Sequence, residues 1–412
     1  MTDGPDHTSK IPKYTFADTL EEQIEQLKTN PVMQQFAESR KRLSAKDRYR
    51  PVYHFTSPES FNGDPNGLCR WQGRWHLFYQ AWPIGDHRQH WGHAVSEDLI
   101  HWYDLPYAIY PHPEQSCFSG SSLVEQDRVI ACYHGWFQVG NMVAISSDPL
   151  LLNWEKLTGK PVLPSKNPDG SRPPYGVFDP CVWKKDGMYY QLTCGAVFRS
   201  KDLVTWKYLH RFVENDRFSA PGDDYSCPYF RPIGDKHILI FFSHSTGPKY
   251  VLGDYDKKRD KLMVTDGGKF NFGAAAGPNG LHAPSSTPDG KGGLVVMFCT
   301  NNENKELGGQ YMMMPRHMTL DAEGKLRQEP KGDIESLRTD HQSVGRTTLP
   351  ANKEVVLDNI KGNAMEMIAE IKCSKETSMV EMNVFRSPDK QEFTRIAFFP
   401  GRGVEVKRGR NK

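Results

Sequence analysis

Several features that mark specialised classes of protein are missing from this sequence of 412 residues. No two of its eight cysteines form a CxxC pair, so neither a zinc ribbon nor a thioredoxin-type motif is expected. Residues 1–13 are polar, and no apolar run is long enough to span a membrane. No signal peptide or membrane segment is visible, so we expect a cytoplasmic protein, or a secreted one if a leader has been removed. A net charge of +2 provides no broad electrostatic field for nucleic acid or membrane surfaces.

Helical periodicity is confined to residues 15–48, near the start of the chain. Leu20, Ile24 and Leu27 lie near helical spacing, and Pro31 interrupts the pattern. We expect residues 1–50 to form a helical extension that takes no part in catalysis.

From about residue 50, strand-like runs alternate with turns rich in Gly, Pro, Asn and Asp. Five central strands are expected, at residues 75–79, 129–133, 188–192, 237–242 and 294–298. A turn motif also recurs, because residues 96–102 resemble residues 200–206, with a looser copy at 147–154. The period of about fifty residues predicts an all-β fold, a five-bladed β-propeller over residues 51–345, with the Trp of each motif packed between sheets.

Beyond residue 350, apolar and polar residues alternate as they do in half-buried strands. Strands are expected at 365–371, 379–385 and 394–399, and residues 346–412 would then form only part of a β-sandwich. A partial sandwich leaves apolar faces and strand edges uncovered. Either the chain is truncated, or another surface or a second subunit of a homo-oligomer covers the gap.

One ordered series of motifs carries the chemistry. The segment N-G-D-P-N-G at residues 62–67 is by itself a turn signal. It is followed by H-L-F-Y-Q at 76–80, W-G-H-A-V-S at 91–96, F-S-G-S at 118–121 and A-P at 283–284. In this order the motifs resemble those of glycoside hydrolase family 32, and the resemblance extends over roughly residues 51 to 400. It implies a β-fructofuranosidase-like enzyme with its site in the central funnel of the propeller.

The resemblance assigns roles to two aspartates. The family uses a retaining mechanism, in which one carboxylate attacks the anomeric carbon and a second carboxyl group protonates the leaving oxygen. Asp64 matches the nucleophile. Asp179 matches the Asp of the family's R-D-P motif, which binds sugar hydroxyls and stabilises the transition state. Phe178 replaces the Arg of that motif, so a bidentate cation is lost and an apolar or stacking surface is gained.

The position of the acid/base residue departs from the family pattern. Ser226 stands where the family's E-C-P motif has Glu, and a serine hydroxyl is no effective acid near neutral pH. Asp223 or Asp224 could supply the proton, and we favour Asp224 because it shares Ser226's side of an extended strand. Otherwise a more distant residue such as Glu214 or Glu303 supplies it, or the acid is absent.

The resemblance also implies a set of substrate-binding residues, namely Asn62, Gln80, Trp91, Phe118, Ser119, Phe178 and His282. We expect no cofactor and no catalytic metal, because the histidines form no H-x-H or H-x-x-x-H pair with a carboxylate partner. The leading hypothesis is a glycosidase that cleaves β-fructofuranosides, or related furanosides, in an oligosaccharide or small glycoside. A non-catalytic sugar-binding propeller, a fructosyltransferase and an inverting furanosidase remain open as alternatives.

Overall fold

The computed structural model describes residues 8–47, 50–59, 62–136, 140–271, 280–300 and 310–410. The chain forms two compact units, Met1–Ile334 and Glu335–Lys412. A short 3₁₀-helix, Ile334–Leu337, lies at the division between them. The first unit holds every candidate site residue named above.

Two helices precede the strands, as the periodicity predicts: α1 (Leu20–Thr29) and α2 (Pro31–Lys46). Pro31 begins the second helix, where its missing N–H costs nothing, and the Asn30 side chain caps that helix by accepting from the Val32 N–H at 2.9 Å. Phe36 of α2 is buried in an apolar cluster made mostly by residues of the first and fifth blades. The helices are therefore a covering layer on the propeller. Within the described residues, neither helix combines the length and the apolar character needed to cross a bilayer.

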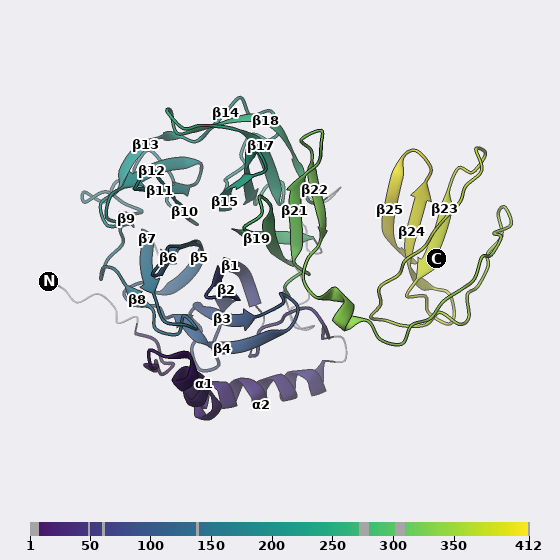
Figure 1. Cartoon of the computed structure of the whole chain (residues 1–412), viewed down its shortest axis with the longest axis horizontal. Coiled ribbons are helices and arrows are strands. Elements are labelled where there is room, and N and C mark those ends of the chain that lie inside the picture. Colours follow the sequence, from purple (N-terminus) through teal and green to yellow (C-terminus); the bar gives the residue numbers. More distant parts are fainter. Residues whose placement is uncertain are drawn as a thin grey trace. The chain divides into compact units, whose positions relative to one another are not determined.

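Five antiparallel sheets surround a common centre in the first unit (Figure 1). The first contains β1 (Asn62–Trp71), β2 (Arg74–Ala81), β3 (His90–Ser96) and β4 (Trp102–Ile109). The second contains β5 (Ser116–Val124), β6 (Val129–Trp136), β7 (Gly140–Ser146) and β8 (Glu155–Lys156), with β9 (Leu163–Pro164) paired to β7. The third contains β10 (Cys181–Lys185), β11 (Met188–Thr193), β12 (Ala196–Ser200) and β13 (Lys207–Arg211).

The remaining two sheets complete the circle. The fourth contains β15 (Ser226–Ile233), β16 (Lys236–Phe242), β17 (Lys249–Asp256) and β18 (Lys261–Lys269), with β14 (Val213–Glu214) parallel to β18. The fifth contains β19 (Leu281–Pro288), β20 (Leu294–Thr300), β21 (Arg316–Leu320) and β22 (Leu326–Pro330). The innermost strands touch in a ring, because β1 contacts β5 and β19, β10 contacts β5 and β15, and β15 contacts β19. The unit is the expected five-bladed β-propeller.

The second strand of each blade contains the apolar run that the sequence predicts. These strands are β2, β6, β11, β16 and β20, and their central residues are buried. A strand in this position is covered on both faces by the adjacent blades, so it reads as a continuous apolar segment rather than as an alternating one. That is why these five segments were the clearest strands in the sequence.

The recurrent turn motif has the same geometry in two copies. In the first, Ser96 Oγ accepts from the Leu99 N–H at 2.9 Å, and the Trp102 ring N–H donates to the Leu99 carbonyl at 2.9 Å. The equivalent bonds at Ser200, Leu203 and Trp206 have the same lengths. Leu99 and Leu203 both adopt positive φ, 71° and 66°. The repeat is therefore a turn that carries the chain from the third strand of a blade to its fourth.

The second unit contains one antiparallel sheet of β23 (Val380–Val384), β24 (Glu392–Phe399) and β25 (Gly403–Arg410). Two of the three strands expected here are present. The third, at residues 365–371, was predicted wrongly, since that segment has no regular structure and Ile368 is 86% exposed. Its alternation has no partner sheet to pack against, so nothing in the described residues stabilises the extended form. The described residues of this unit hold one sheet and no second sheet facing it, so the expected sandwich stays a prediction.

Candidate active site

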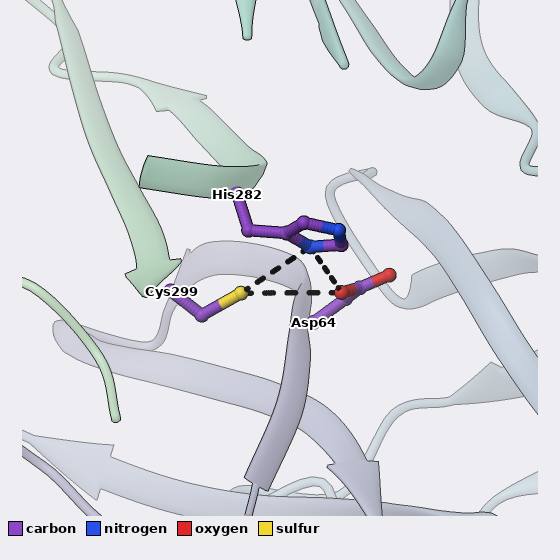
Figure 2. A group of neighbouring side chains, drawn as sticks. All are labelled: Asp64, His282 and Cys299. Carbon is purple, nitrogen blue, oxygen red and sulfur yellow. Dashed lines mark hydrogen bonds and ion pairs between the residues drawn. The ribbon is translucent and has the colours of Figure 1, made fainter. Parts of the chain in front are cut away.

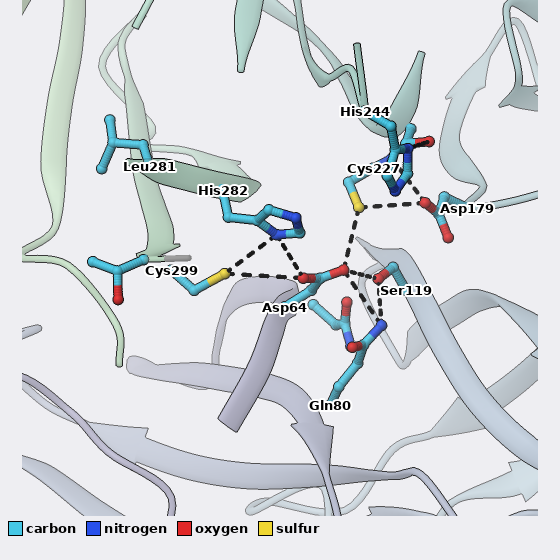
Figure 3. Close-up of polar contacts among 12 residues, drawn as sticks. Asp64, Gln80, Ser119, Asp179, Cys227, His244, Leu281, His282 and Cys299 are labelled. Carbon is cyan, nitrogen blue, oxygen red and sulfur yellow. Dashed lines mark hydrogen bonds and ion pairs between the residues drawn. The ribbon is translucent and has the colours of Figure 1, made fainter. Parts of the chain in front are cut away.

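Asp64 lies on β1, the innermost strand of the first blade, with its side chain 13% exposed. Its Oδ2 accepts from Ser119 Oγ at 2.6 Å and from the Gln80 amide at 3.3 Å. Its Oδ1 lies 3.1 Å from Nδ1 of His282 on β19 (Figure 3). Three predicted residues from three different blades therefore hold one carboxylate.

The backbone at Gly63 explains how Gln80 reaches Asp64. A Cβ at position 63 would lie 2.5 Å from Gln80 Oε1 and 2.8 Å from Gln80 Cβ. The pairing of β1 with β2 shifts register between Asn62 and Pro65, as at a β-bulge. Glycine is thus required between Asn62 and Asp64. The Asn62 side chain itself lies outside the described part of the chain.

Asp64 is held in its charged form. Burial alone would raise its pKa, but hydrogen bonds with His282, Ser119 and Cys227, together with the His282 charge, outweigh burial and lower the pKa below its ordinary value. A carboxylate that stays ionised at neutral pH can act as a nucleophile.

Asp179 lies just before β10 and is only 2% exposed. Its Oδ2 accepts from the Cys227 backbone N–H at 3.1 Å and from the Cys227 thiol at 3.3 Å, and the same thiol lies 3.6 Å from Asp64 Oδ2. The two predicted carboxylates therefore face one compartment, on either side of one sulfur. Asp179 and Cys227 both have positive φ, 35° and 45°, an uncommon conformation for residues other than Gly.

The environment of Asp179 is the opposite of that of Asp64. Burial, and then the negative charge of Asp64, raise the pKa of Asp179 to about 7. Its Oδ1 has no hydrogen-bond partner among the described residues. A buried oxygen without a partner beside a carboxylate is suited to bind a sugar hydroxyl.

Asp224 pairs with a histidine that the sequence did not single out. Asp224 Oδ2 lies 2.8 Å from Ser226 Oγ and 2.6 Å from Nδ1 of His244, and its Oδ1 accepts from the His244 N–H at 3.1 Å. Burial would raise the pKa of Asp224, but the bonds from His244 and Ser226 lower it. The bond to Asp224, with the charges of Asp179 and Asp64, raises the pKa of His244. The proton of the pair therefore resides on His244, which Figure 3 shows beside Cys227 and Asp179.

The other acid candidates have structural partners or lie elsewhere. Asp223 forms a buried ion pair with Lys249 at 2.6 Å. Glu214 is on β14, at the outer edge of the fourth blade, where it pairs with Arg259. Glu303 lies outside the described residues.

Aromatic side chains flank the two carboxylates. The rings of Phe118 and Trp136 are stacked, with centroids 5.1 Å apart, and Phe178 meets Phe118 edge-on at 6.2 Å and His134 at 4.5 Å. Phe178 thus replaces the family's cation with part of an aromatic cluster. The prediction that Trp91 binds sugar is corrected by the structure. Trp91 is fully buried, and it donates its ring N–H to the Phe118 carbonyl at 2.8 Å. It positions Phe118 instead of contacting substrate.

Asp64 also belongs to a group of three side chains, with His282 and Cys299, of the kinds that bind metal ions. Cys299, on β20, places its sulfur 3.9 Å from Asp64 Oδ1 and 3.9 Å from His282 Nδ1 (Figure 2). The three ligand atoms lie within 4.8 Å of one another. Cys299 was not predicted, because a Cys in an apolar strand has the same sequence signature as a core residue.

A propeller that brings two unlike carboxylates together at its centre has the architecture expected of a glycosidase. The chain belongs to glycosyl hydrolase family 32, because the model of that family's N-terminal domain matches residues 54–330.

The relatives are consistent with this assignment. Sucrose-6-phosphate hydrolase of Klebsiella pneumoniae is 32% identical over 368 residues, which cover 76% of this chain and 73% of that protein. Levanase of Bacillus subtilis is 28% identical over 397 residues, covering 85% of this chain but 57% of the levanase. The chain thus spans little more than half of that relative. A solved β-fructofuranosidase of Bombyx mori superposes with a TM-score of 0.67 at 23% identity, covering 93% of this chain and 87% of that one, and shows the same fold.

Proposed function

We propose that this protein is a retaining glycoside hydrolase that cleaves β-fructofuranosidic bonds. The observation that carries the proposal is the pairing of two carboxylates across the Cys227 thiol, with their pKa values moved in opposite directions. Opposite environments for neighbouring acids are typical of catalytic carboxylates. The kinship to levanase and sucrose-6-phosphate hydrolase supports fructofuranosides as the substrate class.

In the first step, Asp64 attacks the anomeric carbon as the bond to the leaving oxygen breaks. The result is a fructosyl ester on Asp64 and a free leaving group. Gln80 and Ser119 hold the second oxygen of Asp64, which leaves Oδ1 on the side of His282. Asp179 Oδ1 binds a sugar hydroxyl that gains acidity as positive charge develops on the ring.

The leaving oxygen needs a proton that Ser226 cannot give. We propose that the Asp224–His244 pair supplies it, with His244 Nε2 as the donor and Asp224 as the residue that orients the ring through Nδ1. His244 is 63% exposed on its side chain and lies in the field of both carboxylates. In the second step, neutral His244 accepts a proton from water, the hydroxide oxygen attacks the ester carbon of the sugar, and Asp64 is released.

The test is hydrolysis of sucrose, inulin, levan and aryl fructofuranosides by the full chain, with NMR detection of the anomer released first. Retention is expected. Asp64→Asn should lower kcat at least about 10³-fold, because it removes the nucleophile. Glu214→Gln, on the outer edge of a blade, is the matched control and should keep the parental rate.

A sugar-binding propeller without catalysis is the second candidate, favoured by Ser226 at the acid position. In that case the parent protein would bind fructosides measurably and release no sugar from any of them. Initial release of the opposite anomer would instead support the inverting alternative.

A further inference from the structure

The Asp64–His282–Cys299 cluster has the composition of a metal site. It contains one carboxylate oxygen, one imidazole nitrogen and one sulfur, from β1, β19 and β20. The mechanism proposed above uses Asp64 and has no role for the Cys299 sulfur. Figure 2 shows the three side chains converging on one point from separate strands.

The separations match tetrahedral zinc. With Zn–S at about 2.3 Å and Zn–N and Zn–O at about 2.1 Å, the ligand atoms of a tetrahedral site lie about 3.4 Å apart for N and O and about 3.6 Å apart for pairs with S. The observed separations are 3.1 Å between His282 Nδ1 and Asp64 Oδ1, and 3.9 Å from Cys299 Sγ to each. Shifts of a few tenths of an ångström suffice.

The surroundings suit a bound cation. Asp64 and His282 are 13% and 18% exposed on their side chains, so an ion can reach them from solvent, while Cys299 is fully buried beneath. The second oxygen of Asp64 is held by Ser119 and Gln80, which orients the first oxygen as supporting groups do in metal sites.

We propose that Asp64, His282 and Cys299 bind a thiophilic divalent cation, Zn²⁺, with water in the fourth position, and that the bound cation inhibits hydrolysis. On binding, the S–H bond breaks, its proton leaves to solvent and a Zn–S bond forms, while His282 binds through neutral Nδ1 and keeps its proton on Nε2. The inhibitory part rests on the proposed function, because the cation occupies the Asp64 oxygen that would attack the sugar.

Binding is tested without reference to activity. The metal-free full chain is titrated with Zn²⁺ against a chromophoric chelator, and with Co²⁺ to detect the thiolate-to-metal absorption band. One site per chain is expected, with the cobalt band present. Cys299→Ser and His282→Gln should each lower the Zn²⁺ affinity at least about 100-fold and, for Cys299→Ser, abolish the band. Cys132→Ala, a fully buried thiol on β6, is the control and should change neither.

Two results would overturn the site: the absence of stoichiometric binding, or a cobalt band that persists in Cys299→Ser.

The inhibition is tested separately by adding Zn²⁺ to the metal-free enzyme. Loss of hydrolysis that a chelator reverses, with resistance in Cys299→Ser, is expected. An unchanged or faster rate at saturating Zn²⁺ would refute inhibition. Failure of the metal-free protein to hydrolyse any fructoside would refute the proposed function, whereas the binding titration would still decide the site.

Discussion

The two sides of the active-site cluster differ in how far they keep the family pattern. On the side of the first two blades, Asp64, Gln80 and Ser119 form a connected set of hydrogen bonds. On the side of the third and fourth blades, Phe178 and Ser226 stand where the family has Arg and Glu. The side that holds the proposed nucleophile therefore keeps the family pattern, whereas both departures from that pattern lie on the other side.

The comparison indicates that the proton donor differs from that of the family. A Glu at position 226 would combine proton donor and tether in one side chain. In the mechanism proposed above, His244 donates the proton, Asp224 orients the His244 ring, and Ser226 donates a hydrogen bond to Asp224. A histidine donor has an ordinary pKa near neutrality, so this side of the site should respond to pH differently from a carboxylic acid.

The sharpest test of this difference is His244→Gln. Loss of the acid should lower kcat by about 10²–10⁴-fold on sucrose, and much less on aryl fructosides, whose leaving groups need little protonation. In the parent, kcat/KM should fall at low pH as Asp64 is protonated and fall again as pH rises through the pKa of His244, which lies above its ordinary value. The variant should lose the alkaline decline.

The control for that change is His237→Gln, at the far end of the same blade's second strand, where His237 stacks on Phe230. It should leave the pH profile of kcat/KM intact. An alkaline limb that survives in His244→Gln would assign it to Asp179, whose pKa is raised to about 7, and would remove His244 from the mechanism.

The sequence predicted the propeller because its signals are local and repeated. Each blade has an apolar second strand, and the motif around Asp98 and Asp202 recurs with its turn geometry. The segment at 365–371 had the same alternation without a surface to bury it, so the pattern alone was insufficient. A strand depends on what covers it, which a single sequence does not record.

The site was predictable only where a motif carried it. Asp64 and Asp179 follow from short motifs, and the structure places them beside one thiol. His244 and Cys299 come from turns and strands without a motif, and their importance arises from blades that meet in space. Trp91 shows that a motif can also mislead. Its ring N–H holds the Phe118 carbonyl, and the sequence motif does not distinguish such a positioning residue from one that binds sugar.

Gly63→Ala should disrupt the side of the site that keeps the family pattern, where Gln80 and Ser119 bind Asp64. The added methyl would overlap Gln80, so Gln80 must move away from Asp64 and Ser119. We expect kcat/KM to fall about 10- to 100-fold and the free energy of unfolding to drop by about 1–3 kcal/mol. Gly159→Ala, where the methyl meets nothing within 4 Å, is the control, and equal losses in both variants would contradict this account.

Asp179→Asn sharpens the electrostatic contrast between the two carboxylates. The folded-state pKa of Asp179 is about 7 against an ordinary value of 3.8, so the folded protein binds more protons between these values. The free energy of unfolding should therefore fall as pH rises through this window, by on the order of 1 kcal/mol or more. Asn does not titrate, so the gain in stability of the variant over the parent should be larger at about pH 8 than at about pH 5. Urea unfolding at both pH values measures it, and a pH-independent difference would contradict the raised pKa.

The smallest expected effect is that of Ser226→Ala. Ser226 Oγ donates one hydrogen bond to Asp224, and its loss should reduce kcat about two- to tenfold, the effect of one ordinary hydrogen bond. Without that bond Asp224 becomes more basic and holds the His244 proton more tightly, so the alkaline limb of kcat/KM should move to higher pH. Ser243→Ala is the matched control, because Ser243 Oγ donates at 2.7 Å to Asp223, which pairs with Lys249. Ser243→Ala should lower the free energy of unfolding and leave the alkaline limb of kcat/KM in place. If the limb shifts in both variants, or in neither, then Ser226 does not act on the proton donor through Asp224.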